Sequence, residues 1–214
     1  MINRRRILKD ALKIENYLAT GKGCRFKLLK KEELDCLKKI NEEDVKFFYE
    51  CDPAANSLEE IKLTYPGYKA ILFYRIAHIL YKKDQKIEAR VVSELAHSIT
   101  GIDINPGAEI GYPFFIDHGT GIVIGETTVI GKSVRLYQGV TLGALSPKKG
   151  QSIKGVKRHP SIENNVVIYA NATLLGDITV GENSVIGGGV FITENIPANS
   201  KVTSPKPVLK IEKH

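Results

Sequence analysis

The chain lacks any long apolar run. Charged residues interrupt every hydrophobic stretch before it reaches the roughly 18 to 20 residues that a membrane-spanning helix needs. The first residues also lack the pattern of a secretory signal, because Arg4 to Arg6, Lys9 and Asp10 interrupt the apolar residues there. We therefore expect a cytoplasmic protein. Its 214 residues allow one domain with a substantial core, or a small domain joined to a larger one.

Cysteine is scarce as well. The three cysteines, Cys24, Cys36 and Cys51, are odd in number and have neither a Cys-x-x-Cys spacing nor a histidine close by. This pattern predicts reduced thiols, and it disfavours both a disulfide framework and a zinc site.

Acidic residues are missing between Glu126 and Glu163, although the chain as a whole carries a formal net charge of +7. The Gly-containing part of this interval gathers basic residues: Lys148, Lys149, Lys154, Lys157 and Arg158. Such a segment suits a polyanion, either a nucleic acid or the phosphates of a coenzyme. No nucleic-acid-binding motif accompanies it, which favours the coenzyme.

What the second half does have is a period of six residues. Every sixth position is aliphatic in three phases: Ile104, Ile110 and Ile116; then, after a two-residue slip, Ile124, Ile130, Leu136 and Leu142; then, after a long interruption, Ile162, Ile168, Leu174, Val180, Ile186 and Ile192. Helices repeat at 3.6 residues and plain strands at two, so a period of six indicates short strands joined by tight corners.

A second set of positions supports the same interpretation. Four residues after the aliphatic position come mostly small or β-branched residues: Ala108, Thr128, Val134, Val140, Val166, Ala172, Ile178, Ser184 and Val190. These residues can fill a second inward position, so the pattern predicts a parallel β-helix in which each coil packs on the next. The interruption from Leu145 to His159 is predicted to be a loop that leaves the coil.

The first 100 residues follow a helical pattern instead. Asp52-Pro53 reads as a helix start, and Ser57 to Glu60 reads as a capping box. Residues 68–82 and 86–99 carry apolar stripes at helical spacing, the second formed by Ile87, Val91, Leu95 and Ile99. We predict an α+β chain with a helical domain at 1–100, a β-helix at 101–204 and a tail at 205–214, the helix before Gly101 ending there.

Polar residues that a repeat does not need gather around the first coils and the loop. A histidine is a suitable general base near neutral pH, and a carboxylate on its other nitrogen would fix the tautomer, which suits His118 and Asp103. Asp117, Asp52 and Arg158 could bind the ammonium and carboxylate of an amino acid. We expect these groups and His159 to lie near one cleft.

Structural interpretations of the same residues stay open at this point. Asp52 could be only a helix cap, Asp103 a corner cap and Asp117 a turn residue, while Arg158 and His159 could be solvated loop residues. His78 and His97 lie among helical apolar residues and suit the core or an interface.

The chain resembles serine O-acetyltransferases, the enzymes that open cysteine biosynthesis, from about residue 47 to 204. The motifs that carry the resemblance are Asp52-Pro53-Ala54, Tyr74 to His78, Gly101 to Ala108, Phe115 to Thr127, Gln138 to Gly143 and Lys157-Arg158-His159-Pro160. Hexapeptide repeats alone also occur in sugar and succinyl transferases. The Asp117-His118-Gly119 segment together with Arg158-His159-Pro160 is much narrower.

The resemblance implies a left-handed β-helix that assembles as a trimer, with active sites between neighbouring coils. His118 would deprotonate the serine hydroxyl, Asp103 would orient His118, Asp52 and Asp117 would bind the serine ammonium, and Arg158 and His159 its carboxylate. The co-substrate acetyl-CoA would lie along the coils, and no metal is expected. Its expected contacts are Ala144, Ala170 and Gly188, to which we add Lys148 and Lys149 for the phosphates.

Three departures limit what the resemblance implies. The loop between Leu142 and Arg158 is long, and the helical domain is short for the hexameric members, so both a homotrimer and a dimer of trimers stay open. The best-known members end in an isoleucine that docks into a sulfhydrylase. This chain ends Ile211-Glu212-Lys213-His214, so a complex with a sulfhydrylase is not predicted.

Other functions remain as alternatives. A hexapeptide acetyltransferase that acts on a sugar or an antibiotic would share the fold, but a neutral sugar gives no reason for the clustered charges. A zinc enzyme of the γ-carbonic anhydrase type needs three converging histidines, and the second half offers only His118, His159 and His214. A non-catalytic trimeric scaffold would not need the ionisable group.

Overall fold

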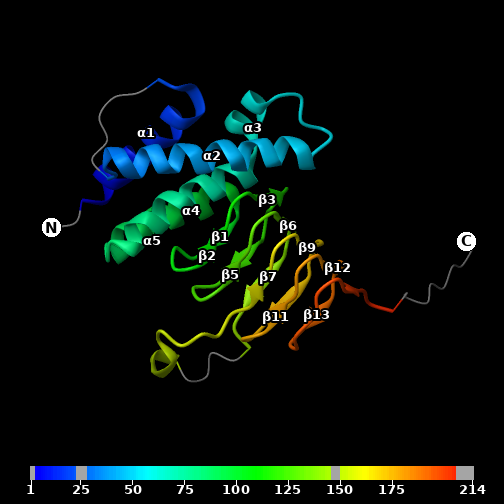
Figure 1. The fold of residues 1–214 in the computed structure, drawn as a ribbon. Coiled ribbons are helices and arrows are strands. Elements are labelled where there is room, and N and C mark those ends of the chain that lie inside the picture. Colours follow the sequence, from blue (N-terminus) through cyan, green and yellow to red (C-terminus); the bar gives the residue numbers. More distant parts are fainter. Residues whose placement is uncertain (1–2, 23–27, 146–149, 206–214) are drawn as a thin grey trace, which may run out of the picture.

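The computed structural model describes residues 3–22, 28–145 and 150–205 and shows a helical domain stacked on one end of a β-helix (Figure 1). The helices are α1 (Arg4–Thr20), α2 (Lys31–Cys51), α3 (Leu58–Thr64), α4 (Pro66–Lys82) and α5 (Lys86–Thr100). None of the helices in the described ranges is both long enough and apolar enough to cross a membrane. Lys148, Lys149, Cys24 and the tail from residue 206 lie outside these ranges.

The β-helix has three faces, each a parallel sheet. Sheet A stacks β1 (Asp103–Ile104), β4 (Val123–Ile124), β7 (Thr141–Gly143), β10 (Thr173–Leu175) and β13 (Phe191–Ile192). Sheet B stacks β2 (Glu109–Ile110), β5 (Val129–Ile130), β8 (Ser161–Ile162) and β11 (Thr179–Val180). Sheet C stacks β3 (Phe114–Asp117), β6 (Val134–Tyr137), β9 (Val167–Ile168), β12 (Val185–Ile186) and β14 (Lys201–Val202).

The six-residue repeat explains this packing. Each predicted aliphatic position lies in a strand and is buried, as the successive partners Ile104, Ile124, Leu142, Leu174 and Ile192 of sheet A illustrate. The second predicted set is buried as well, from Ala108 in the first coil to Val190 in the last. The predicted order of a helical domain followed by a parallel β-helix with one extruded loop is therefore confirmed, and the described part of the loop contains the 3-10 turn η1 (Gly150–Ile153).

The helical domain is fastened to the first coil by buried polar groups. Arg75 of α4 forms two hydrogen bonds with the carboxylate of Asp44 in α2 and donates to the carbonyl oxygens of Ile110 and Gly111. The hydroxyl of Tyr74 donates to the carbonyl oxygen of Ala108 at 2.6 Å. Removing one partner of a buried ion pair strongly destabilises a protein, because the other charge stays buried without compensation. These contacts therefore stabilise the packing of the helical domain against the first coil.

One local prediction for the helical half is wrong. Asp52-Pro53 does not start a helix: Asp52 follows the last residue of α2 and caps its C-terminus. The predicted helix over 86–99 is present as α5, but its apolar stripe faces outward at its ends, where Ile87 is 58% exposed and Ile99 is 50% exposed. The buried face of α5 consists instead of small residues, which allow close packing on α4: Ala89, Val92, Ser93, Ala96 and Thr100.

The two-residue slip in the repeat between Ile116 and Ile124 corresponds to a longer corner of the β-helix. In later coils the corner from sheet C to sheet A is made by one left-handed residue, such as Gly139, Asn171 and Gly189. Between β3 and β4 the corner is two residues longer, and it contains His118, with φ of 54°, followed by Gly119, with φ of 87°. His118 is thus part of an insertion that leaves the coil.

Candidate functional site

His118 lies in this insertion, directly after the end of β3. A positive φ is unusual for a residue with a side chain and aims this imidazole away from the coil, and the side chain is 75% exposed. Its Nε2 lies 3.8 Å from a carboxylate oxygen of Asp117. An imidazole held at the surface beside a carboxylate can accept a proton from a bound hydroxyl.

Asp117 and Asp52 converge on the same place from different parts of the chain. The hydroxyl of Tyr65, the residue before α4, donates to Asp52 at 2.6 Å, and the backbone N–H of Ala54 donates to the other Asp52 oxygen at 2.8 Å. The hydrogen bond to Asp52 raises the pKa of Tyr65 to about 12, and the negative charge of Asp117 contributes to this shift. The two carboxylates therefore form an anionic site suited to an ammonium group.

Asp103 occupies the outward side of β1, and its nearest ionisable neighbours are on α5. Oxygens of Asp103 and Glu94 and a ring nitrogen of His97 lie within 4.8 Å of one another. Within the described ranges no hydrogen bond or ion pair joins Asp103 to His118. The single chain thus places Asp103 one coil before His118, in line with Val123 of sheet A, without bringing the two side chains into contact.

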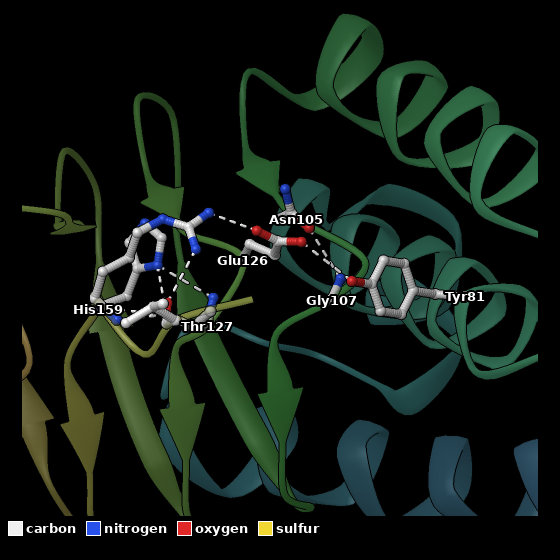
Figure 2. Close-up of polar contacts among 8 residues, drawn as sticks. Tyr81, Asn105, Gly107, Glu126, Thr127 and His159 are labelled. Atoms are coloured by element: carbon white, nitrogen blue, oxygen red, sulfur yellow. Dashed lines mark hydrogen bonds and ion pairs between the residues drawn. The ribbon is translucent and has the colours of Figure 1, made fainter. Parts of the chain in front are cut away.

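Arg158 is held by an acidic residue that the sequence analysis did not single out as a site residue. The guanidinium of Arg158 pairs with Glu126 at 2.5 Å, and the hydroxyl of Tyr81 in α4 donates to the other oxygen of Glu126 at 3.1 Å (Figure 2). The hydrogen bond from Arg158 lowers the pKa of Glu126. Glu126 is the last acidic residue before the acid-free interval, a sequence signal that could have identified it.

His159 is buried beside the same corner, with its ring over Gly125. Its Nδ1 faces the backbone N–H and the hydroxyl of Thr127 (Figure 2). Burial lowers the pKa of His159 to about 4, and the nearby positive charges of Arg158 and Lys157 act in the same direction. His159 is therefore neutral over the physiological range, and nothing in the repeat pattern pointed to Thr127 as its partner.

The predicted residues thus form two groups at two corners of one chain. Asp117 and His118 lie where sheet C turns into sheet A, whereas Arg158 and His159 lie where sheet A turns into sheet B. The stretch from Gly121 to Gly125 separates these corners by about 13 Å, since extended chain rises about 3.3 Å per residue. Among the described residues of one chain, the two groups therefore do not meet in the single cleft that we expected.

The residues predicted to contact the co-substrate divide in the same way. Ala170 and Gly188 stack in successive coils at the sheet C to sheet A corner, and a Cβ on Gly188 would lie 3.1 Å from the carbonyl oxygen of Ala170. Ala144 lies at the other corner, in a pocket of about 350 Å³. That pocket is lined by Glu126, Ala144, Gly150, Gln151, Ile153, Lys154 and Arg158. Lys154 supplies a cation there, while Lys148 and Lys149 lie outside the described residues.

A β-helix of hexapeptide coils with a histidine and charged groups at its corners defines the class of hexapeptide-repeat acyltransferases. The family model of bacterial transferase hexapeptides (six repeats) matches residues 159–194. A plasmid-encoded serine acetyltransferase from Synechococcus elongatus is 56% identical over 170 residues, which cover 78% of this chain and 53% of that protein. The chain thus spans about half the length of that cyanobacterial relative.

Other relatives align over most of their length. Serine acetyltransferase from Bacillus subtilis is 48% identical over 160 residues, or 75% of this chain and 71% of that protein. The solved structure of serine acetyltransferase isoform 3 from Entamoeba histolytica, in complex with cysteine, is 38% identical, has a TM-score of 0.77 and covers 95% of this chain and 72% of that one. The Neisseria gonorrhoeae enzyme in complex with serine is 31% identical, with a TM-score of 0.76 over 95% of this chain and 87% of that one. The chain belongs to the serine acetyltransferase family, and the predicted left-handed β-helix agrees with this family of hexapeptide-repeat proteins.

Proposed function

We propose that the protein transfers the acetyl group of acetyl-CoA to the hydroxyl of L-serine, giving O-acetyl-L-serine and CoA, and thereby opens cysteine biosynthesis. The observation that carries this proposal is the division of charge between the two corners: two carboxylates converge beside His118, and an arginine–histidine pair occupies the other corner. A zwitterionic amino acid needs both kinds of partner. The relatives named serine acetyltransferase support the same substrate.

His118 acts as the general base in this mechanism. It takes the proton of the serine hydroxyl while the oxygen attacks the thioester carbon of acetyl-CoA, and the carbon–sulfur bond then breaks. The imidazolium returns the proton to the leaving CoA sulfur. No acyl-enzyme forms, because the serine oxygen itself attacks the thioester. In the assembled site Asp103 would orient His118 and stabilise its charged form, although the two side chains do not contact each other within the described part of one chain.

Asp52 and Asp117 bind the serine ammonium, and Arg158 and His159 bind the carboxylate. The hydrogen bond from Tyr65 to Asp52 supports the first assignment, because it fixes one carboxylate in place. The ion pair between Arg158 and Glu126 supports the second, since it holds the guanidinium at the mouth of the pocket. Arginine offers a carboxylate two parallel hydrogen bonds.

A second copy of the chain is needed to complete this site. Both charged groups of serine are attached to one carbon atom, so a single serine cannot contact two corners about 13 Å apart. A homotrimer, alone or as a dimer of trimers, would bring the His118 corner of one chain against the Arg158 corner of the next. Acetyl-CoA would then lie between the chains, against Ala144 of one copy and Ala170 and Gly188 of the other.

One further expectation accompanies this function. The free thiols of Cys36 and Cys51 suit the reducing cytoplasm, where we place the enzyme.

The alternative is a hexapeptide acetyltransferase that acts on another small hydroxylated acceptor. The test measures thiol release from acetyl-CoA with L-serine, D-serine, L-homoserine, L-threonine and a galactoside, with His118→Ala as the control. Release with L-serine that is lost in the variant supports the proposal. Release with another acceptor only would overturn the substrate, and release with none would favour a non-catalytic scaffold.

A further inference from the structure

Thr127 makes an unusual number of contacts with the two residues at the second corner. Its backbone N–H donates to Nδ1 of His159 at 3.1 Å, and its hydroxyl lies 2.8 Å from the same nitrogen. The hydroxyl oxygen also accepts the backbone N–H groups of Arg158 and His159, at 2.9 and 3.2 Å (Figure 2). One side chain on the coil thus holds the segment where the long loop returns.

These contacts determine which nitrogen of His159 carries the proton. A backbone N–H can only donate, so Nδ1 must be an unprotonated acceptor. The Thr127 oxygen already accepts two N–H groups, so its own proton is free to point at Nδ1. A neutral imidazole with an occupied acceptor at Nδ1 must carry its proton on Nε2.

The Nε2–H group is available for a ligand. Among the residues that the structure describes, no group forms a hydrogen bond with this nitrogen. The charged residues around the ring are Arg158, Lys157 and Glu126. Burial and the positive charges of Arg158 and Lys157 lower the pKa of His159 to about 4, against the opposing effect of Glu126, so the imidazole is neutral near pH 7. His159 therefore offers a donor whose presence does not depend on protonation in that range.

We infer that Thr127 is a positioning residue: it holds His159 in the Nε2–H form and fixes Arg158 beside it, so that the pair recognises the carboxylate of the acceptor. This inference rests on the proposed function, because it assigns the acceptor's carboxylate to this pair. A purely structural Thr127 would only secure the returning loop. The two roles predict different effects of losing the hydroxyl. A positioning role lowers kcat/KM only for acceptors that carry a carboxylate, whereas a purely structural role affects all acceptors alike.

The neighbouring residue supplies a matched control. Thr128 is fully buried, and its hydroxyl is the buried side-chain polar atom that lacks a hydrogen-bond partner among the described residues. Thr127→Val removes the bonded hydroxyl, Thr128→Val removes the unbonded one, and Thr127→Ser keeps the hydroxyl. The three variants change side-chain volume little.

The kinetic experiment compares kcat/KM for L-serine with that for ethanolamine, which is serine without its carboxylate, in the full-length protein. Thr127→Val removes the hydroxyl that contacts the His159 ring and the backbone N–H groups of Arg158 and His159. It should lower kcat/KM for L-serine at least about tenfold, mainly through KM, since one hydrogen bond alone contributes up to about that factor. It should leave ethanolamine and the KM for acetyl-CoA within about twofold. Thr127→Ser should restore the value, and Thr128→Val should resemble the unchanged protein. An equal loss of kcat/KM with both acceptors, or a failure of Thr127→Ser to restore kcat/KM for L-serine, would overturn the positioning role.

A spectroscopic measurement keeps this inference separate from the proposed function. Nitrogen-15 NMR of the histidine rings at pH 7, with His159→Gln to assign the signal, reports which ring nitrogen is protonated. A proton on Nε2 is the expected result, and a proton on Nδ1 would overturn the inference even if the enzyme acetylates serine. If L-serine proves not to be a substrate, the proposed function fails, and the carboxylate role fails with it whatever the tautomer.

Discussion

Gly125 lies where a side chain would displace His159, so Gly125→Ala tests how tightly that ring is held. A Cβ at this position would lie 2.1 Å from Cδ2 and 2.2 Å from Nε2 of the imidazole. Ordinary contacts between carbon atoms are about 3.5 to 4.0 Å. The ring must therefore move by more than about 1 Å, and its hydrogen bonds to Thr127 cannot survive such a shift.

Two effects determine how much Gly125→Ala lowers the free energy of unfolding. Overpacking a well-filled site costs about 1 to 3 kcal/mol, and each lost hydrogen bond about 0.5 to 1.5 kcal/mol. We expect Gly125→Ala to lower the free energy of unfolding by about 2 to 4 kcal/mol. In the His159→Ala background the same change should cost much less, which gives a coupling free energy of at least about 1.5 kcal/mol.

Urea unfolding at one fixed protein concentration measures these differences, because assembly makes the apparent stability depend on concentration. Gly143→Ala is the matched control: Gly143 follows the same aliphatic position one coil later, and a Cβ there would lie 2.8 Å from the end of the Leu175 side chain and 3.4 Å from Cγ2 of Thr141. This control should cost less than about 1 kcal/mol. Equal losses for Gly125→Ala and Gly143→Ala, or additive effects with His159→Ala, would refute the reasoning.

Four further predictions concern the mechanism and stability. His118→Ala should lower kcat by about 10² to 10⁴ and leave the melting temperature unchanged, since the side chain is 75% exposed; steady-state kinetics and a thermal melt check both. Arg158→Lys should raise the KM for serine because a lysine cannot form two parallel bonds; an unchanged KM would remove Arg158 from carboxylate binding. Because the pKa of His159 is lowered by folding, the unfolded chain binds a proton at a higher pH than the folded chain does. The free energy of unfolding should therefore fall as the pH drops from 6.5 toward about 4, by up to about 3 kcal/mol. His159→Gln should remove this pH dependence of urea unfolding. Arg75→Met should cost about 3 to 5 kcal/mol in the same assay by leaving Asp44 buried without its partner, and a loss below 1 kcal/mol would contradict that role.

The fold was predictable because one short period governs half the chain. Each coil repeats the same burial pattern, so the repeat position alone predicts that a residue such as Ile168 or Leu174 points inward. No information about distant contacts is needed. The helical half had weaker signals. Asp52 satisfies the preferences of a helix start, yet tertiary packing places it at the end of α2, where its carboxylate meets Tyr65.

The sequence indicated candidate site residues, but it did not indicate how they lie relative to one another. The two interruptions of the period contain Asp117 and His118 in one case and Arg158 and His159 in the other, because a chain that leaves the coil is free to carry polar groups. The sequence could not reveal that these segments leave the coil at different corners. It also missed Glu126 and Thr127, which occupy regular corner positions and become important only through their contacts with the returning loop.

The one-dimensional stacking of the β-helix has a consequence for its motions. Each coil hydrogen-bonds only to the coils before and after it, so opening should begin at the free end, at β13 and β14, and should become harder toward the helical domain. The residues proposed to bind serine lie in the helical domain and the first three coils, whereas the proposed acetyl-CoA contacts at Ala170 and Gly188 extend toward the free end. Amide hydrogen exchange in the last coils should therefore slow when the long co-substrate joins successive coils together, and change little when the small amino acid binds.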